Sequence, residues 1–414
     1  MKSATAADPV PPMPLFAFKP IRLALAVFSF VGCFAVQSGS ALAQPHLLLD
    51  LDNGKVLSHQ QAFDPWHPAS LTKVMTAYVI FEAIRRGEVA LDDTVRVSKT
   101  AARQPPSKMG YAPGTVLSVE SALKLLIVKS ANDIAVALAE HVGGSVDGFA
   151  AMANAEARRL GMTGSTFANP HGLHDARQVI TARDFGILLL TLHRDHARYR
   201  DWFSAPGLVA QKRNKQGKLI DRVYYSYNLL LERYRGADGF KTGFVCASGY
   251  NYAGSATRAG RRLAAIVLGR DSQTSRAVDA AKLLSGGFEQ PAGAGTPLSE
   301  LRPTGETPAA PRNMRSVMCS EAARNARYEP GAGLAVIDSP WLQKRTKQAI
   351  ALRAPLASAA LVVRVPLPVF RPDIPSLGVD KTPDAAEPIS VAERMSPRLP
   401  PGLTVPTFRP AAVN

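Results

Sequence analysis

Two hairpin signals that lie far apart in the chain constrain its fold most. The first is an apolar run, His46–Asp52, followed by Asn53-Gly54 and then by Lys55–Leu57. An Asn-Gly pair between two apolar runs is a strong signal for a tight turn. The second signal is a pair of alternating segments, 250–257 and 262–268. Helical patterns occupy the chain between the two signals, so we expect both hairpins to share one sheet with helices packed on it.

Four segments between these hairpins have the apolar spacing of helices: Ser70–Arg86, Val119–Val142, Val146–Leu160 and Thr181–His196. The first of them is apolar nearly all round, which indicates a helix buried in a core, and Gly87 ends it. We therefore predict an α+β fold, in which an antiparallel sheet is flanked by helices.

Residues 1–43 have the pattern of an export signal. Basic residues precede an apolar run, Leu23–Val36, which is too short for a stable membrane anchor. Ala41-Leu42-Ala43 then forms a small-x-small cleavage site. The alternatives are a retained anchor or a lipoprotein modified at Cys33, whose flanking sequence is a poor signal for lipid attachment. We expect cleavage after Ala43 and a mature protein in the periplasm or cell envelope.

Proline divides the rest of the chain. Of the 32 prolines, 19 lie in residues 290–414 and 8 in residues 44–289. The stretch 291–311 is rich in Ala, Gly, Pro and Thr, which is typical of a linker because such a composition buries little apolar surface. We predict one folded domain over residues 44–289, followed over 290–414 by a Pro-rich linker and a poorly ordered tail.

The net charge of +16 favours an anionic partner or surface. The chain has neither a Lys/Arg block nor an aromatic base-stacking motif, so we expect no nucleic-acid partner. Its histidine pairs lack the adjacent carboxylate of a zinc protease and no Cys/His cluster occurs, so we expect no metal and no other cofactor. The segment Trp341–Lys347 is a faint candidate for contact with a membrane surface, and the sequence leaves membrane association open.

Two cysteines, Cys246 and Cys319, remain after loss of the export signal. In an oxidising compartment such a pair either forms a disulfide or remains as two free thiols. The sequence does not decide between these alternatives.

Three short motifs follow one another along the chain, and the first opens the buried helix. In Ser70-Leu-Thr-Lys73 the lysine lies one turn after the serine, on the same face. A serine hydroxyl becomes a good nucleophile when a neighbour takes its proton. A lysine does so only when neutral, which burial and nearby positive charge favour. The alternative, a capping serine beside a solvated lysine, places a lysine on an apolar helix at high cost. We therefore expect Ser70 to be a nucleophile and Lys73 its base.

The second motif, Ser130-Ala-Asn132, interrupts an apolar helical stretch. Two polar side chains in such a place need hydrogen-bond partners. We interpret Ser130 as a proton relay between Lys73 and a leaving nitrogen, and Asn132 as a group that holds a substrate amide. The alternative is a helix junction that Ser130 caps.

The third motif, Lys241-Thr-Gly243, precedes the second hairpin, so we expect it on a strand at the edge of the sheet. Gly243 permits the close approach of a peptide backbone. Lys241 and Thr242 offer a cation and a hydroxyl to a carboxylate. The alternative is a solvated edge-strand lysine that guards against aggregation.

The region from His46 to about Gln290 resembles the serine-type D-alanyl-D-alanine carboxypeptidases among the low-molecular-mass penicillin-binding proteins. The resemblance extends to the residues around the motifs: Pro68–Thr76, Lys129–Ala137, Asn169–Leu173, Asp238–Phe244 and Ser248–Asn251. It implies a sheet flanked by helices, with a mainly helical subdomain that bears Ser130. It also implies peptidoglycan stem peptides as substrates and β-lactams as inhibitors.

The resemblance implies the same roles for the residues of the three motifs and adds two features. The main-chain N–H groups of Ser70 and Phe244 form the oxyanion hole in the family. Arg276, located by an ungapped count from Lys241, resembles a family arginine that assists binding of the carboxylate. The chain departs from the family in residues 290–414, which show neither the β-rich second domain nor the terminal amphipathic helix that members often have.

Other functions are compatible with part of this pattern. A DD-endopeptidase, which cleaves peptidoglycan cross-links, would use the same residues and is the main rival. A class A β-lactamase shares the three motifs but uses a glutamate in an E-x-x-L-N context, and residues 165–173 contain no glutamate. Ala131 also stands where those enzymes usually carry aspartate. A wall- or nucleic-acid-binding protein without enzymatic activity would form no penicillin adduct. We therefore expect a D-alanyl-D-alanine carboxypeptidase.

Overall fold

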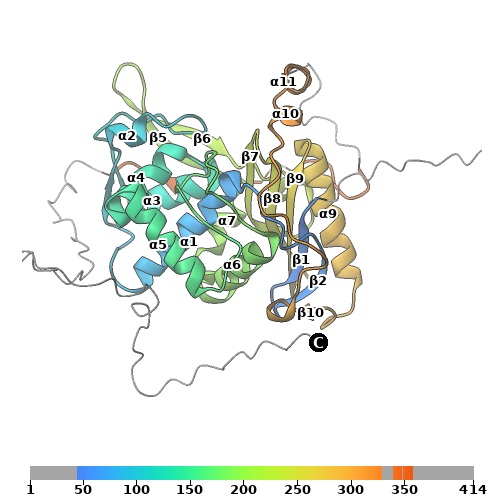
Figure 1. Ribbon diagram of the computed structural model, residues 1–414. Coiled ribbons are helices and arrows are strands. Elements are labelled where there is room, and N and C mark those ends of the chain that lie inside the picture. The colour runs from blue at the N-terminus through green and yellow to red at the C-terminus, as the bar shows by residue number, and fades with distance from the viewer. Residues whose placement is uncertain (1–43, 329–338, 347, 358–414) are drawn as a thin grey trace, which may run out of the picture. The chain divides into compact units, whose positions relative to one another are not determined.

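A six-stranded antiparallel sheet organises the protein. The computed structural model describes residues 44–328, 339–346 and 348–357. The strands of the sheet are β1 (His46–Asp50), β2 (Lys55–Gln60), β7 (Ala237–Val245), β8 (Gly249–Arg258), β9 (Arg261–Arg270) and β10 (Thr296–Pro297). They lie in the order β10-β2-β1-β9-β8-β7, so that β7 is an edge strand (Figure 1).

The two predicted hairpins meet in the middle of this sheet. β1 pairs with β2 on one side and with β9 on the other, and both pairings are antiparallel. β8 and β9 form the second predicted hairpin. The prediction that both hairpins share one sheet is therefore confirmed. Gly54 turns the first hairpin with a φ of +73°, a conformation that glycine adopts at little cost.

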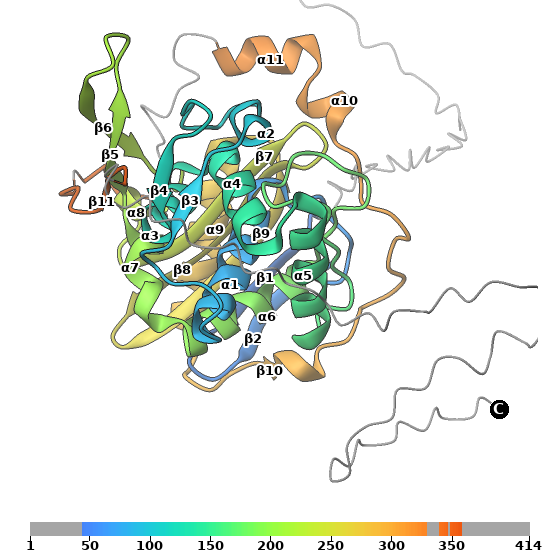
Figure 2. The ribbon, with the colours of Figure 1, turned by 90° about the vertical axis from the view of Figure 1, so that its left-hand side faces the viewer.

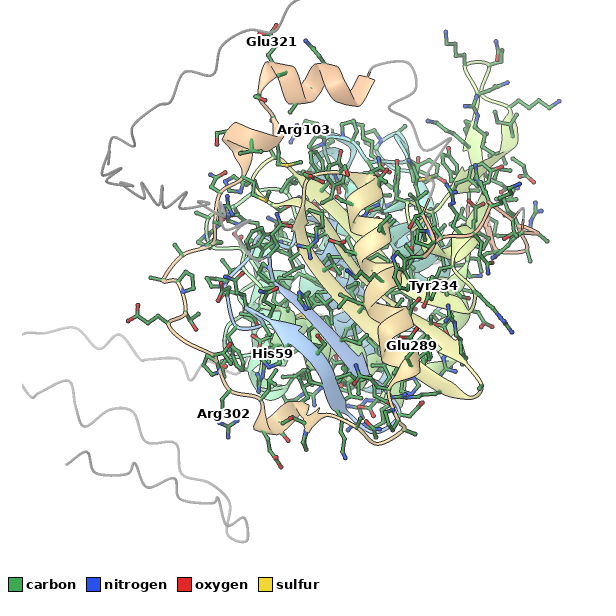
Figure 3. All side chains as sticks on the ribbon, turned by 90° about the vertical axis from the view of Figure 1, so that its right-hand side faces the viewer. His59, Arg103, Tyr234, Glu289, Arg302 and Glu321 are labelled. Atoms are coloured by element: carbon green, nitrogen blue, oxygen red, sulfur yellow. A yellow bond between two sulfur atoms is a disulfide. The ribbon has the colours of Figure 1, made fainter. Side chains whose placement is uncertain are left out.

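Helices cover both faces of the sheet. α9 (Gln273–Glu289) lies across one face (Figure 3). α1 (Thr72–Arg85), α6 (Ala182–Asp195) and most of the other helices gather on the opposite side (Figure 1). The predicted α+β fold with a mainly helical part is confirmed. The remaining helices of the catalytic region are α2 (Lys99–Ala102), α3 (Val119–Lys124), α4 (Asn132–Gly143), α5 (Val146–Arg159), α7 (Arg200–Ser204) and α8 (Leu230–Arg233).

Strand β1 shows how the two layers share one strand. Leu47 and Leu49 belong to the apolar cluster that contains α1 and α6, whereas Leu48 belongs to the cluster that contains α9. All three side chains are at most 1% exposed. A strand that is buried on both faces has a continuous apolar sequence instead of an alternating one.

Helix α1 is the buried helix that the sequence predicts. Every residue from Thr72 to Ala83 is buried. A tight 3-10 turn, Ala69–Leu71, precedes the helix and carries Ser70. The N–H of Gly87 donates to the carbonyl of Ile84 at 3.0 Å, where the helix ends.

The single helix predicted over Val119–Val142 is wrong, because the chain breaks at Ser130. Ser130 has a φ of +61°, in the left-handed region. The N–H of Asn132 donates to the carbonyl of Ser107 at 2.7 Å, and the carboxylate of Asp133 accepts from two N–H groups of the same loop. These bonds to a neighbouring loop replace the bonds that a continuous helix would need. The segment instead forms α3, a π-helical turn (Leu125–Lys129) and α4.

The other two predicted helices are confirmed as α5 and α6. Each begins at a side-chain cap: the hydroxyl of Ser145 accepts from Gly148 N–H, and that of Thr181 accepts from Asp184 N–H. Two smaller sheets complete the fold. They contain β3 (Thr94–Arg96), β4 (Val116–Ser118), β5 (Gly207–Arg213), β6 (Leu219–Tyr225) and β11 (Arg353–Ala354).

The stretch 291–311, predicted to be a linker, packs in part on the folded domain. β10 pairs with β2, and the side chains of Leu298 and Leu301 are buried in the apolar cluster of α6. The linker interpretation is therefore wrong for residues 296–301. Their composition is poor in apolar side chains, but the two leucines are enough to hold this part of the chain on the folded domain. The domain boundary after residue 289 stays a prediction. Most of the predicted tail, residues 358–414, lies outside the described residues.

Residues beyond this stretch include α10 (Arg315–Met318) and α11 (Glu321–Tyr328). Between these two helices, Cys319 forms a disulfide with Cys246. This finding settles the alternative that the sequence left open. The disulfide closes a loop with a sequence separation of 73 residues. In the chain-entropy description, a loop of this length stabilises the folded state by about 4 kcal/mol.

Among the described residues, none of the helices combines the length and the apolar character that a membrane crossing requires.

Because β1 is buried on both faces, we expect the truncation of one of its side chains to lower the free energy of unfolding strongly. Leu48→Ala removes a side chain that is 1% exposed, so the free energy of unfolding should fall by about 2–5 kcal/mol. Urea denaturation measures this change. Leu219→Ala, at an exposed leucine of β6, is the matched control and should change it by less than about 0.5 kcal/mol. Equal losses for the two variants would contradict the packing described for β1.

Candidate active site

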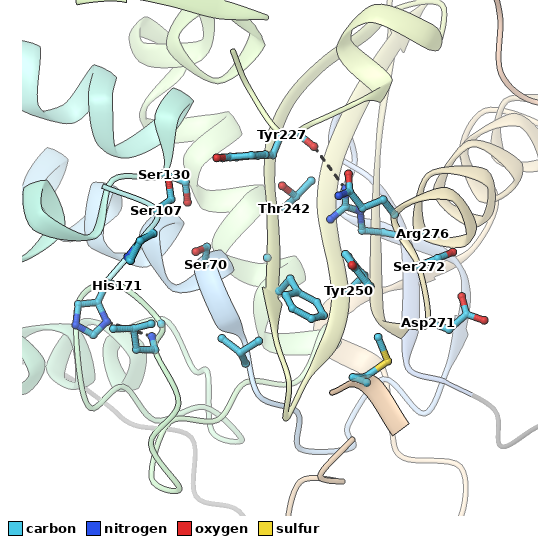
Figure 4. A pocket seen from close by; sticks show the side chains of 18 of the residues that line it. Ser70, Ser107, Ser130, His171, Tyr227, Thr242, Tyr250, Asp271, Ser272 and Arg276 are labelled. Atoms are coloured by element: carbon cyan, nitrogen blue, oxygen red, sulfur yellow. Dashed lines mark hydrogen bonds between the residues drawn. The ribbon is translucent and has the colours of Figure 1, made fainter. Parts of the chain in front are cut away.

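A cavity of about 840 Å³ lies between the start of α1 and strand β7 (Figure 4). It brings together most of the residues that the sequence singled out. The predicted site residues that line it are Ser70, Ser130, Asn132, Thr242, Gly243, Phe244 and Arg276. The two remaining predicted residues, Lys73 and Lys241, are buried immediately behind this lining.

The backbone before Ser70 adopts a conformation that needs support. Ala69 has a φ of +49°, which is costly for a residue with a side chain. The hydroxyl of Thr72 donates to the carbonyl of Ala69 at 2.8 Å. Gly172 lies against the same carbonyl, so closely that a Cβ at this position would come within 1.8 Å of the oxygen. The turn is therefore held by its own helix and by the 169–173 loop.

Asn251 on β8 fixes the same turn from the sheet. Its amide Nδ2 donates to the carbonyls of His67 and Pro68 at 2.9 and 3.1 Å. Its Oδ1 accepts from the N–H of Gly269 at 2.9 Å, and the side chain is fully buried. Asn251 therefore positions the backbone that leads into Ser70. It belongs to one of the sequence segments that carry the resemblance, but the sequence assigned it no role.

Lys73 lies in direct contact with Ser70. Its Nζ is 3.0 Å from Ser70 Oγ, 2.7 Å from Asn132 Oδ1 and 2.6 Å from the carbonyl oxygen of His171. The side chain is 1% exposed. Burial, and secondarily the positive charge of Lys241, hold the pKa of Lys73 well below its usual value. The expected burial of Lys73 is confirmed, and its role as a base stays a prediction.

The partners of Lys73 accommodate a neutral amine as well as an ammonium, which donates to all three oxygens. A neutral amine has two N–H donors and one lone pair. The two oxygens of Asn132 and His171 accept hydrogen bonds only, so they occupy both donors. The lone pair is then left for the hydroxyl hydrogen of Ser70. In the neutral form of Lys73, this arrangement would allow a proton to move from Ser70 Oγ to Lys73 Nζ.

The 169–173 loop supplies one of these acceptors from its main chain. Burial and the neighbouring Lys73 lower the pKa of His171 to about 3, so its ring is neutral. The ring Nδ1 accepts from the N–H of Leu173 at 3.1 Å. The sequence analysis included this loop in the family resemblance but did not predict the contact between Lys73 and the carbonyl of His171. Every residue type carries a main-chain carbonyl, so the sequence pattern gives no sign of such a contact.

Ser130 and Asn132 line the cavity, and Figure 4 shows Ser130 across the cavity from β7. Asn132 Nδ2 donates to the carbonyl of Pro105 at 2.9 Å, which fixes the amide with its oxygen toward Lys73. Ser130 is 4% exposed and lies at the chain break before α4. The predicted Ser130-Ala-Asn132 motif therefore places a hydroxyl and an amide next to the Ser70–Lys73 pair.

Positive groups gather at β7, which carries Lys241, and at the start of α9, which carries Arg276. Burial, followed by the charges of Arg276 and Lys129, lowers the pKa of Lys241 to about 7. Burial also lowers the pKa of Arg276 to about 10. The Nε of Arg276 has no hydrogen-bond partner among the described residues, although it is buried. With the hydroxyl of Thr242, these groups form a site that suits an anion such as a carboxylate.

Gly243 allows close contact between β7 and the turn that carries Ser70, and not only the expected approach of a substrate peptide. The sequence analysis interpreted it as a site of close approach for a peptide. A Cβ at Gly243 would lie 2.9 Å from both the carbonyl oxygen of Pro68 and the nitrogen of Ser70. The close approach is therefore internal, and it brings the main chain of β7 next to that of Ser70.

Comparisons with known proteins agree with this geometry. The family model described as D-alanyl-D-alanine carboxypeptidase matches residues 33–272. The chain is 34% identical over 280 residues to D-alanyl-D-alanine carboxypeptidase DacC of Escherichia coli K12, a match that covers 66% of each chain. The match spans slightly less than two thirds, 62–66%, of the length of the first curated relatives.

Solved structures extend the comparison. Penicillin-binding protein 5 from Haemophilus influenzae is 33% identical, with a TM-score of 0.54 over 60% of this chain and 71% of that one. Penicillin-binding protein D2 from Listeria monocytogenes, solved in its cefotaxime-bound form, is 29% identical, with a TM-score of 0.51 over 59% of this chain and 97% of that one. These structures share the fold, and the family model matches more than half of the chain. The chain therefore belongs to the D-alanyl-D-alanine carboxypeptidase family.

Proposed function

We propose that the protein is a serine-type D-alanyl-D-alanine carboxypeptidase that removes the terminal D-alanine from peptidoglycan stem peptides. The contact between Lys73 Nζ and Ser70 Oγ, at 3.0 Å in a buried setting, carries this proposal. It supplies an activated nucleophile at the wall of a cavity. The cationic groups of Lys241 on β7 and Arg276 on α9 supply a site for the terminal carboxylate.

The first half of the reaction is an acylation. Ser70 Oγ attacks the carbonyl carbon of the penultimate D-alanine while Lys73 takes its proton. The main-chain N–H groups of Ser70 and Phe244 stabilise the oxyanion of the tetrahedral intermediate. Ser130 passes its proton to the leaving nitrogen and receives the proton held by Lys73, so Lys73 becomes neutral again. The C–N bond breaks, and D-alanine departs. The peptide remains attached to Ser70 as an ester.

The second half is a hydrolysis. Water attacks the ester carbonyl, Lys73 takes a proton from that water, and the C–O bond to Ser70 breaks with return of a proton to Oγ. Asn132 holds the peptide through its side-chain amide during both halves. No glutamate lines the cavity within the described part of the chain. This observation favours a peptidase over a class A β-lactamase, which uses such a residue to activate water.

The same proposal includes the place of action. Residues 1–43 carry the export signal, and the enzyme works in the periplasm or cell envelope after cleavage behind Ala43. These residues lie outside the described part of the chain. The disulfide between Cys246 and Cys319 supports an oxidising compartment. The net charge of +16 suits an anionic wall surface.

The direct test measures product and adduct together. Residues 44–414 should release free D-alanine from a pentapeptide stem faster than they convert cross-linked dimers to monomers at equal concentration. Penicillin should add once, on the tryptic peptide of Ser70, as detected by mass spectrometry, and Ser70→Ala should abolish both. Faster cleavage of dimers would replace this function by that of a DD-endopeptidase. An adduct on Ser130 alone would contradict the role of Ser70.

Lys73→Arg tests the base. Arginine keeps the charge but does not lose its proton at useful pH. The rate of Ser70 acylation by penicillin should therefore fall by about 10²- to 10⁴-fold, the usual contribution of a general base. Stopped-flow acylation measures it, and circular dichroism checks the fold. Lys99→Arg, at an exposed lysine of α2, is the matched control and should acylate normally. Near-normal acylation of Lys73→Arg would mean that another group activates Ser70.

The pKa of Lys241, about 7, predicts that kcat/KM depends on pH differently for substrates with and without a free terminal carboxylate. For a substrate with a free terminal carboxylate, kcat/KM should fall as pH rises through about 7, because Lys241 loses its charge in the free enzyme. It should also fall at low pH, where Lys73 becomes protonated. An amidated substrate should react at least about 100-fold more slowly and should lack the decline above neutrality. Identical alkaline limbs for both substrates would contradict the role of Lys241.

A further inference from the structure

A segment beyond the matched family region is fixed to the rim of the cavity. We call residues 314–325 the tethered segment. The disulfide between Cys319 and Cys246 joins it to the turn between β7 and β8. The N–H of Met314 donates to the carbonyl of Ala247 at 2.9 Å in the same turn. Met314 and Met318 are buried, at 5% and 3% exposure, in the main apolar cluster. The segment is therefore held by a covalent bond, a hydrogen bond and two apolar side chains.

The tethered segment contributes directly to the wall of the catalytic cavity. Val317, Met318 and Ala323 line it together with residues 271–274, where α9 begins. α9 begins at the same end of the sheet as the β7–β8 turn, because Tyr250 at the start of β8 pairs with Arg270 at the end of β9. Figures 1 and 2 both show α10 and α11 beyond this end of β7. The cavity is therefore bounded there by protein.

This end of the cavity is the side on which Arg276 lies. Figure 4 shows Ser70 and Ser130 on one side of β7, and Arg276, Ser272 and Asp271 on the other. The guanidinium of Arg276 stands 5.7 Å from the ring centroid of Tyr250, which also lines the cavity. In the proposed function, Arg276 helps to bind the carboxylate of the departing amino acid. The tethered segment therefore bounds the space that the leaving group enters.

The size of that leaving group separates two reactions. A carboxypeptidase releases one D-alanine, whereas cleavage of a cross-link releases a whole second stem peptide. We propose that the tethered segment closes the leaving-group side of the cavity and so selects substrates that lose a single amino acid over cross-linked peptides. This inference rests on the proposed function and assigns to the tethered segment the choice between stem peptides and cross-linked peptides.

Two features of the segment fit a role in selection. Val317 is 59% exposed although it is apolar and lines the cavity, so its side chain is available to a substrate. The family model ends at residue 272, before the segment begins. The groups that activate Ser70 lie elsewhere, on α1, on α4 and in the 169–173 loop. Moving the segment should therefore change which substrate fits without changing how Ser70 is activated.

The test compares two substrates with the tether closed and open. The kcat/KM for a cross-linked dimer is divided by that for the pentapeptide stem, and the rate of penicillin acylation is measured in parallel. Opening the disulfide of the full chain, with a reductant or as Cys246→Ser/Cys319→Ser, should raise the ratio at least about tenfold, which corresponds to about 1.4 kcal/mol of lost steric barrier. Acylation should stay within about twofold, because Ser70 and Lys73 are untouched. The reductant should have no further effect on the double variant.

A second variant keeps the disulfide intact and changes only the wall. Val317→Ala should raise the same ratio by at least about threefold, since it removes apolar volume from the cavity lining. Val223→Ala is the matched control, because Val223 on β6 is 47% exposed and lies outside the cavity lining. If the protein still releases D-alanine but the ratio is unchanged both after reduction and in Val317→Ala, the inference is overturned and the proposed function stands. Oxidised protein that neither releases D-alanine nor reacts with penicillin would overturn the proposed function itself, and this inference with it.

Discussion

The burial of the Lys73 amine is the constraint on which the site and much of the fold depend. A cation in an apolar core is costly, so burial favours the neutral form of the amine and requires its hydrogen bonds to be complete. Its partners come from three separate parts of the chain: Ser70 on the preceding turn, Asn132 at the start of α4, and the carbonyl of His171 in the 169–173 loop. The same burial that makes Lys73 costly to fold favours the neutral amine that its proposed role as a base requires.

The position of Ser70 likewise couples the helical part to the sheet. Asn251 reaches from β8 to the two carbonyls before the turn, and Gly243 lets β7 approach the nitrogen of Ser70. Gly172 packs closely against the carbonyl of Ala69 from the helical side. The unusual backbone of Ala69 is therefore held by neighbours on both sides, which is how a costly conformation persists at a functional site. Ser70, the proposed nucleophile, lies where the two layers meet, and contacts from both layers hold the turn that carries it.

Local patterns in the sequence predicted the elements that depend on local interactions. The Asn53-Gly54 turn, the core helix after Ser70 and the edge-strand position of Lys241 all follow from short-range chemistry. The break at Ser130 was missed because Asn132 N–H bonds to a loop that is distant in sequence. The packing of Leu298 was missed for the same reason. The acceptor at His171 is a main-chain oxygen, which every residue carries, so no residue type could reveal it.

The central place of β1 has a consequence for how the chain acquires its structure. β1 is among the first described residues, yet its second neighbour is β9, with Leu48 opposite Ala265. Contacts between such distant residues form slowly, because a long loop must close before they are made. Until β9 has been synthesised, β1 keeps one unpaired edge and one row of apolar side chains in water, and such edges invite aggregation. Of the strands that the structure describes, the first to be made is therefore among the last to be completed.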